Sequence, residues 1–357
     1  MSPRLGDTLA AINLATVALL VAALLFAATT LLLRLRNARK AARWRRVEAA
    51  WTPPLVEVLA GDRPPEELAA RVAPADVLLF ADFLLRFARR LRGAERGLLL
   101  RLARPCLPAV ARRLASRNPE RRARAVQTLA LLGPETYGAE LVRALDDRAP
   151  LVAMVAARAL AAGRDPGHGA AVLAHLGRFG EWSPRYLASM LAGMGPEAGP
   201  ALVDLLADSA AAPRLRAVAG DTLRLLKDLA APGVAAAVLR AGQAAGAATD
   251  RELAASCLRL VAALGRPEHL ESVRPLLASA DDVIRAAATQ ALAQLAAGDA
   301  ADTAALARAA SDPSPWVALE GARGLRRLGA LATLDALAAS GGPGALVARQ
   351  VRWEAAA

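Results

Sequence analysis

A 13-residue pattern recurs seven times between residues 121 and 329, with an apolar start, small residues in the middle, Leu near the ninth place, and a final Leu or similar residue before Gly or a small residue. The copies end at residues 133, 163, 195, 227, 265, 296 and 329, so neighbouring copies lie 30 to 38 residues apart. A second, shorter apolar segment follows most copies, which predicts that each unit is a helix, a turn and a second helix. One helical pair cannot bury its apolar face alone, so the repetition predicts an all-α solenoid with a continuous core.

Asp and Pro open most units, where they supply N-caps and first-turn prolines. These units resemble short bacterial HEAT repeats of the PBS-lyase type, best in residues 281–296, with Ile284, and residues 312–329, with Val317. The resemblance covers residues 118–340 and implies a HEAT-like solenoid of helical hairpins, in which a consensus Arg ties neighbouring repeats together. That Arg is present as Arg122, Arg216 and Arg285, and is replaced by Val152, Pro184, Ala254 and Ala318 in the other copies.

The amino-terminal stretch of residues 8–33 contains no charged side chain. About 20 apolar residues suffice to cross a bilayer, so residues 10–33 are predicted to form a transmembrane helix. A cleaved signal peptide would carry its basic residues before the apolar run, whereas here they follow it. The basic residues that follow, a predicted membrane-surface flank, are Arg34, Arg36, Arg39, Lys40, Arg43, Arg45 and Arg46. Basic flanks stay in the cytoplasm, so we expect residues 1–9 outside and the body inside, at the inner (cytoplasmic) membrane.

Prolines and glycines divide the rest of the chain. Pro53 and Pro54 are expected to end a basic juxtamembrane helix over residues 34–52, and residues 53–117 to form a divergent helical cap on the repeat array of residues 118–340. Residues 341–357 are expected to supply a last capping helix whose Val347, Val351 and Trp353 close the core. A Gly/Ala-rich interval, residues 241–249, is interpreted as a connecting loop without a binding role.

The net charge of +12 is concentrated near the amino terminus. Residues 1–52 carry 8 basic and 2 acidic side chains and residues 84–124 carry 13 and 2, whereas residues 125–357 carry 22 and 23. This distribution fits an end that faces a membrane better than a nucleic-acid-binding face spread along the folded domain. The dense run at residues 86–124 nevertheless leaves a polyanion-binding module open as an alternative.

No motif for catalysis, a cofactor or a metal is recognisable in the sequence. His168, His175 and His269 lack metal-ligand spacing, and Cys106 and Cys257 stand alone at apolar helical positions. Acidic pairs fall at repeat starts, where negative charge stabilises a helix N-terminus. The sequence therefore predicts a protein that is not an enzyme and has no cofactor.

The combination of anchor, basic neck and repeat array resembles bacterial membrane-anchored HEAT-repeat proteins. That resemblance implies a scaffold that binds a protein partner through the cytoplasmic solenoid, with a membrane enzyme such as a glycosyltransferase as one class of partner. Trp182 and Trp316, near the starts of two units, are candidate partner-binding residues because Trp is enriched in binding hot spots. HEAT-like DNA glycosylases and bilin lyases are the enzymatic alternative, although no catalytic cluster can be assigned.

Overall fold

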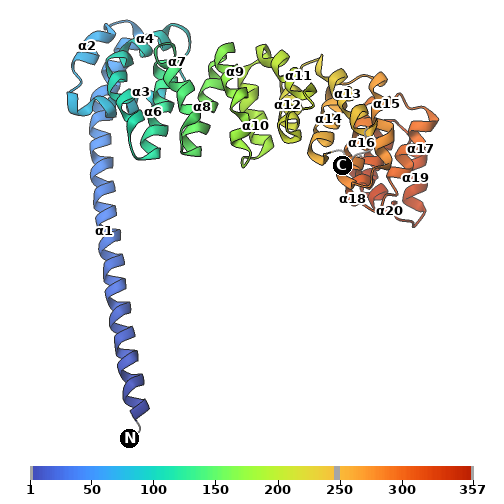
Figure 1. The fold of residues 1–357 in the computed structure, drawn as a ribbon, viewed down its shortest axis with the longest axis horizontal. Coiled ribbons are helices and arrows are strands. Elements are labelled where there is room, and N and C mark those ends of the chain that lie inside the picture. The colour runs from blue at the N-terminus through green and yellow to red at the C-terminus, as the bar shows by residue number, and fades with distance from the viewer. Residues whose placement is uncertain (1–2, 245–249, 355–357) are drawn as a thin grey trace. The chain divides into compact units, whose positions relative to one another are not determined.

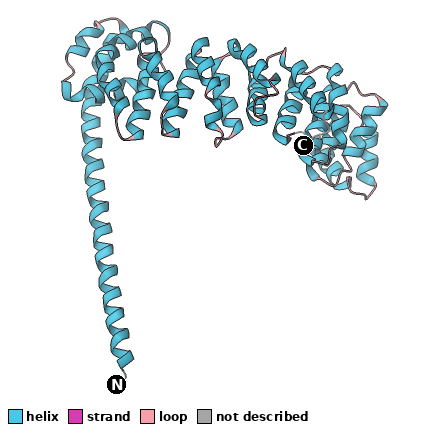
Figure 2. Ribbon diagram, viewed as in Figure 1, coloured by secondary structure: helices cyan, strands magenta, loops and turns pink. Residues whose placement is uncertain are grey.

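The computed structural model describes residues 3–244 and 250–354, without the side chains of residues 3–13, 15 and 40. Every regular element in these residues is an α-helix or a 3₁₀-helix, as expected from the sequence (Figures 1 and 2). The chain divides into two compact units, Met1–Val110 and Ala111–Ala357, which are described separately.

The first unit is built on one long helix, α1 (Pro3–Ala60). Its other elements are α2 (Pro65–Ala70), η1 (Pro74–Asp76), α3 (Val77–Phe87), α4 (Gly93–Ala103) and η2 (Arg104–Cys106), and α5 (Leu107–Ala111) ends at the boundary between the units. The core forms where the last turns of α1 meet α3: Trp51 lies edge-on to Phe80 with ring centroids 4.9 Å apart, and 5.6 Å from Phe83.

The expected end of the juxtamembrane helix at Pro53 is wrong, because α1 continues through Pro53 and Pro54 to Ala60. Each proline removes one backbone donor from the helix, and such a loss ordinarily breaks it. Here the turns after the prolines carry Leu55 and Val58, which are fully buried in the core of the first unit. Burial of two such side chains contributes about 3–6 kcal/mol and so offsets a large part of the penalty, which is about 3 kcal/mol or more for each proline.

The second unit consists of helical pairs and confirms the predicted α-solenoid. The first helices of the pairs are α6 (Pro119–Leu132), α8 (Pro150–Gly163), α10 (Pro184–Leu191), α12 (Pro213–Leu226), α14 (Arg251–Leu264), α16 (Asp282–Leu295) and α18 (Pro315–Arg327). The second helices are α7 (Pro134–Arg143), α9 (Pro166–Ala174), α11 (Gly199–Ala207), α13 (Ala231–Ala244), α15 (Leu270–Val273), α17 (Ala300–Ala309) and α19 (Leu331–Ala339). Short 3₁₀ segments connect them: η3 (Arg112–Ala115), η4 (Ala144–Asp146), η5 (Leu176–Phe179), η6 (Ala192–Met194), η7 (Pro196–Ala198), η8 (Pro267–His269) and η9 (Arg274–Ala278).

First and second helices form two rows in this unit (Figure 1). Consecutive first helices pack directly on one another, most extensively α16 on α18 and α12 on α14. The recurring Leu of the sequence pattern supplies the core, since Leu129, Leu223, Leu292 and Leu325 are fully buried. Small residues allow close approach: a Cβ on Gly321 of α18 would lie only 2.8 Å from the Leu306 carbonyl oxygen at the end of α17.

Helix α20 (Ala345–Glu354) closes the repeat array only in part. Val351 is fully buried and Val347 is half-buried, as predicted. Trp353 is 74% exposed, so its predicted place in the core is wrong. The reason is helical geometry: Val351 and Ala348 occupy the face that meets α18 and α19, and Trp353, two residues beyond Val351, points to another side.

Candidate binding surfaces

Two of the three consensus arginines join neighbouring repeats through a carboxylate. Arg122 of α6 donates from Nε and Nη2 to the two oxygens of Asp147, both at 2.7 Å, ahead of α8. Arg285 of α16 makes the same pair of bonds, both 2.9 Å, with Asp312 ahead of α18. The tie that the HEAT resemblance implied is therefore present at both positions.

These links have the electrostatics of a structural contact. The guanidinium of Arg122 lowers the pKa of the Asp147 carboxyl, and that of Arg285 does the same to the pKa of Asp312, chiefly through the charged hydrogen bonds. Each carboxylate also accepts a backbone N–H two residues on, from Ala149 at 2.8 Å for Asp147. Carboxyls held ionised in this way are poor proton donors, so the pairs do not form an acid–base site.

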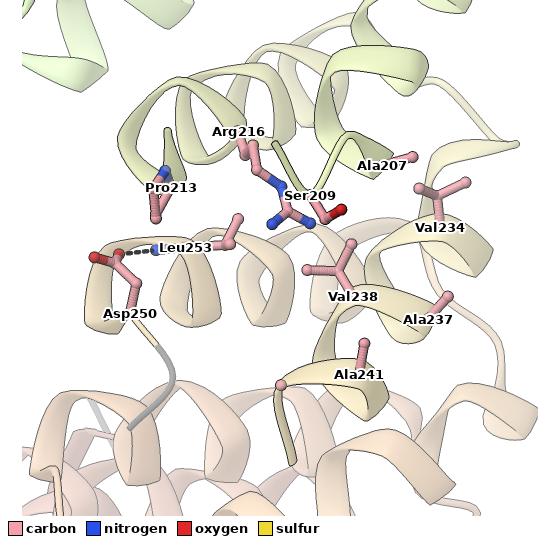
Figure 3. A pocket seen from close by; sticks show the side chains of 11 residues that line it. Ala207, Ser209, Pro213, Arg216, Val234, Ala237, Val238, Ala241, Asp250 and Leu253 are labelled. Carbon is pink, nitrogen blue, oxygen red and sulfur yellow. Dashed lines mark hydrogen bonds between the residues drawn. The ribbon is translucent and has the colours of Figure 1, made fainter. Parts of the chain in front are cut away.

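The third consensus arginine, Arg216 of α12, binds no carboxylate of the described residues. Its Nε donates to the carbonyl oxygen of Leu206 at 2.9 Å, and in the described part of the chain neither Nη atom has a hydrogen-bond or ion-pair partner. Arg216 instead lines a pocket of about 480 Å³ between α11, α12, α13 and α14. Val234, Val238 and Leu253 make this pocket mainly apolar, and the guanidinium points into it (Figure 3).

The structure changes the interpretation of residues 241–249. Helix α13 continues to Ala244, and Ala241 and Gly242 line the pocket, so this part of the interval is not a loop. Residues 245–249 lie outside the described residues. The sequence did not predict the pocket. The pocket lies in the repeat where the spacing between neighbouring copies is longest, at 38 residues.

The two candidate tryptophans do not occupy equivalent positions. Trp316 is the second residue of α18 and is 71% exposed. Trp182 precedes the N-cap Ser183 of α10, is half-buried, and stacks on Tyr186 with ring centroids 5.5 Å apart. Its carbonyl oxygen accepts from Arg214 of the next repeat at 2.9 Å. The Trp182 ring therefore stacks within its own repeat and its backbone carbonyl binds the next one, whereas Trp316 presents its ring to solvent.

The predicted basic flank lies on α1. Arg34, Arg36, Arg39, Arg45 and Arg46 are exposed, and the side chain of Lys40 falls outside the description. Arg43 instead forms an ion pair with Asp76 of η1. Next to Arg43 on α1, the ring of Trp44 has the guanidinium of Arg86 from α3 at 4.2 Å from its centroid. The same guanidinium donates to Glu48 of α1 at 2.8 Å. From Arg43 onward α1 thus contacts the rest of the first unit, although Arg45 and Arg46 themselves stay exposed.

The basic run at residues 86–124 is divided between the two units. In the first unit, Arg89, Arg90 and Arg101 are exposed, while Arg86 is bound to Glu48. In the second unit, Arg122 forms an ion pair with Asp147. The run is therefore not a uniform row of free cations.

A polar groove lies along α10, α12 and α14 in the second unit. Arg185, Glu252 and Arg259 line a pocket of about 570 Å³ there, and Arg259 donates to Asp221 of α12 at 2.9 Å. The charges of Arg259 and Asp221 thus pair within this groove.

The histidines and cysteines show structural contacts. His175 Nε2 lies 3.3 Å from an Asp146 oxygen, and His269 Nδ1 accepts the backbone N–H of Arg266 at 2.8 Å. Burial raises the pKa of the Cys106 thiol to about 11 and that of Cys257 to about 12, so both stay protonated. Among the described residues, no group of three or more His, Cys, Asp or Glu side chains is placed to hold a metal ion.

Comparison with known proteins gives structural matches only. No sequence-family model matches the chain, and no curated protein matches it. A structure of the karyopherin Kap121p bound to the protein phosphatase Cdc14p is similar over 79% of this chain and 38% of its own, at 16% identity and a TM-score of 0.45. The CpcE–CpcF complex of phycocyanin lyase from Nostoc sp. matches over 70% and 87%, at 19% identity and a TM-score of 0.33. An engineered protein matches over 85% and 98%, at 16% identity and a TM-score of 0.35. The chain thus spans little more than a third of the length of the karyopherin.

Proposed function

We propose that this protein is a non-enzymatic, membrane-anchored adaptor whose solenoid binds a protein partner. The observation that carries the proposal is the apolar part of α1, where large side chains such as Leu20, Leu24 and Phe26 are 62–74% exposed. Monomeric soluble proteins rarely expose so long an apolar surface to water. The 24 residues 10–33 extend for about 36 Å as a helix and so exceed the hydrocarbon thickness of about 30 Å.

The proposed orientation places the solenoid in the cytoplasm of a bacterial cell, at the inner membrane. The exposed arginines that follow Leu33 are the kind of flank that resists translocation. Residues 34–42 add about 14 Å of helix before the first contact with the rest of the unit at Arg43. The proposed geometry therefore holds the first unit close to the headgroups, where the free arginines meet anionic lipid.

Two features of the second unit support partner binding. Helical arrays of this kind present extended surfaces to which proteins bind. Trp316, a large aromatic side chain that is largely exposed, offers an anchor on that surface, because buried Trp dominates many interfaces. A membrane enzyme such as a glycosyltransferase remains the partner class that the family resemblance implies.

Crosslinking in cells followed by purification of the full chain in detergent tests this function. We expect one membrane enzyme or assembly factor to be enriched, to survive nuclease and moderate salt, and to decrease when Trp316 is replaced by Ala. The exposed Leu229→Ala is the matched control, since Leu229 is 78% exposed on the same unit.

Two results would contradict the adaptor. Recovery of nucleic acid alone, lost between low and moderate salt, supports the polyanion-binding alternative, because phosphate contacts are strongly salt-dependent. Release of a free base from damaged DNA by the purified full chain, or bilin transfer to a phycobiliprotein, supports the enzymatic alternative.

A further inference from the structure

Arg216 occupies the same helical position as the two arginines that bind a carboxylate. Arg122, Arg216 and Arg285 are each the fourth residue of a first helix, in α6, α12 and α16. For Arg122 and Arg285, the partner is an Asp three residues before the next first helix. The corresponding position before α14 is Ala248, outside the described residues, and its side chain carries no carboxylate.

The contacts of Arg216 leave its carboxylate-binding atoms available. In the two linked repeats, Nε and Nη2 bind the Asp while Nη1 donates to backbone carbonyls, such as that of Ser279 at 2.9 Å from Arg285. In Arg216, Nε takes the backbone role by binding Leu206, so both Nη groups remain directed at the pocket (Figure 3). The half-buried guanidinium is thus poised for an acceptor that the described residues do not supply.

The acidic residue of the pocket lining does not pair with Arg216. Asp250, the acidic residue that lines it, accepts the backbone N–H of Leu253 at 3.0 Å as the N-cap of α14. No ion pair joins Asp250 to Arg216 in the part of the chain that the structure describes. The other residues of the lining are apolar or small, and Ser209 is the one polar side chain among them.

We propose that this pocket binds the carboxylate of an Asp or Glu side chain on an extended segment of a protein partner. The linked repeats show the form of the ligand: Asp312 is followed by Pro313, Ser314 and Pro315, and it accepts the Ser314 N–H at 2.8 Å. A partner segment of the type Asp, any residue, small residue, Pro carries the same acceptor, and its small and proline side chains fit the apolar lining. Arg favours such a ligand because its guanidinium binds carboxylate with two parallel hydrogen bonds.

This inference deepens the proposed adaptor function and rests on its partner-binding part. It identifies one point of that interface, without depending on the membrane topology. A peptide-binding experiment therefore tests the pocket separately from the adaptor function. If the peptide does not bind but a cellular partner is still captured, the carboxylate-binding pocket is refuted and the adaptor function is not.

The probe is a fluorescein-labelled peptide that copies residues 309–315 of this chain, Ala-Ala-Ser-Asp-Pro-Ser-Pro, titrated with the full chain in detergent. Fluorescence anisotropy reports binding. We expect the Asp→Asn peptide to bind about ten- to a hundredfold more weakly, since one charge-assisted hydrogen bond contributes on that scale. Arg216→Gln should cause the same loss with the Asp peptide, and Arg216→Lys a smaller one.

Arg240→Gln is the matched control, because Arg240 is exposed on α13 but does not line the pocket. It should bind the peptide like the unaltered chain. Equal binding of the Asp and Asn peptides to the unaltered chain, or no binding of either, overturns the proposal. This comparison uses the unaltered chain alone and does not depend on whether a variant folds. Undiminished binding to a folded Arg216→Gln variant overturns it as well.

Discussion

Replacing Arg285 by Ala should destabilise the carboxy-terminal repeats by about 2–4 kcal/mol. The side chains of Arg285 and Asp312 are only 16% and 14% exposed, so little water is available to replace the lost contact. The substitution removes two charged hydrogen bonds to Asp312 and leaves its mostly buried carboxylate without a cationic partner, and it also frees the carbonyl of Ser279. Hydrogen bonds to charged groups contribute about 1.5–3 kcal/mol, and breaking a buried pair costs about 3–5 kcal/mol, which brackets this partly exposed case.

Urea denaturation of the full chain in detergent, followed by far-UV circular dichroism, measures the effect. A loss of this size should lower the midpoint by about 1 M for a slope near 3 kcal/mol/M. Repeat arrays can lose their ends separately, so hydrogen exchange of the α18 amides provides the local measurement, with protection lost there before α6. Arg143→Ala is the control, because Arg143 pairs with Glu140 at the surface with 73% exposure and should change stability by under about 1 kcal/mol.

A double-mutant cycle with Asp312→Ala decides whether the link is the cause. Removal of both partners should cost less than the sum of the single losses, with a coupling of about 1–3 kcal/mol. Because the pKa of Asp312 is lowered in the folded chain, this stabilisation is complete above the unfolded pKa of about 3.9 and is lost as pH falls through the folded value. An Arg285→Ala loss no greater than that of Arg143→Ala, or a coupling near zero, refutes the argument.

One substitution and one labelling reaction test the packing. Gly321→Ala should destabilise the chain by about 1–3 kcal/mol, because the added methyl meets backbone atoms at the end of α17. Gly97→Ala in α4, with open space around it, should be neutral or stabilising, and equal urea midpoints for the two variants would contradict the close approach at Gly321. Cys257, with a pKa near 12, should resist iodoacetamide at pH 8 in the folded chain and react only in denaturant, as mass spectrometry will show; rapid labelling of the folded chain contradicts its burial.

Sequence periodicity was sufficient to predict the solenoid, because each first helix repeats the same buried positions. Leu129, Leu223 and Leu292 recur at one place in the pattern and are all buried. Local signals failed where tertiary packing decided the outcome. Pro53 is a strong helix breaker by itself, yet burial of Leu55 and Val58 keeps α1 continuous beyond it.

The candidate binding residues were predictable only in part. Sequence located Arg216 within the consensus, but its unpaired state depends on which atom meets the Leu206 carbonyl and on which residue precedes α14. Trp182 and Trp316 both lie near the start of a repeat unit, but their burial differs because one precedes its helix while the other lies within it. Sequence spacing does not fix the direction of a side chain.

The membrane anchor is tested most directly by carbonate extraction of the full chain, with a reporter fused to its carboxyl end. We expect the chain to remain in the membrane pellet and the reporter to be cytoplasmic. Leu20→Arg with Leu24→Arg, costing about 5–7 kcal/mol of insertion, should release the chain, whereas the surface change Leu229→Arg should not. Complete extraction of the unaltered chain, or a periplasmic reporter, would contradict the proposed anchored adaptor.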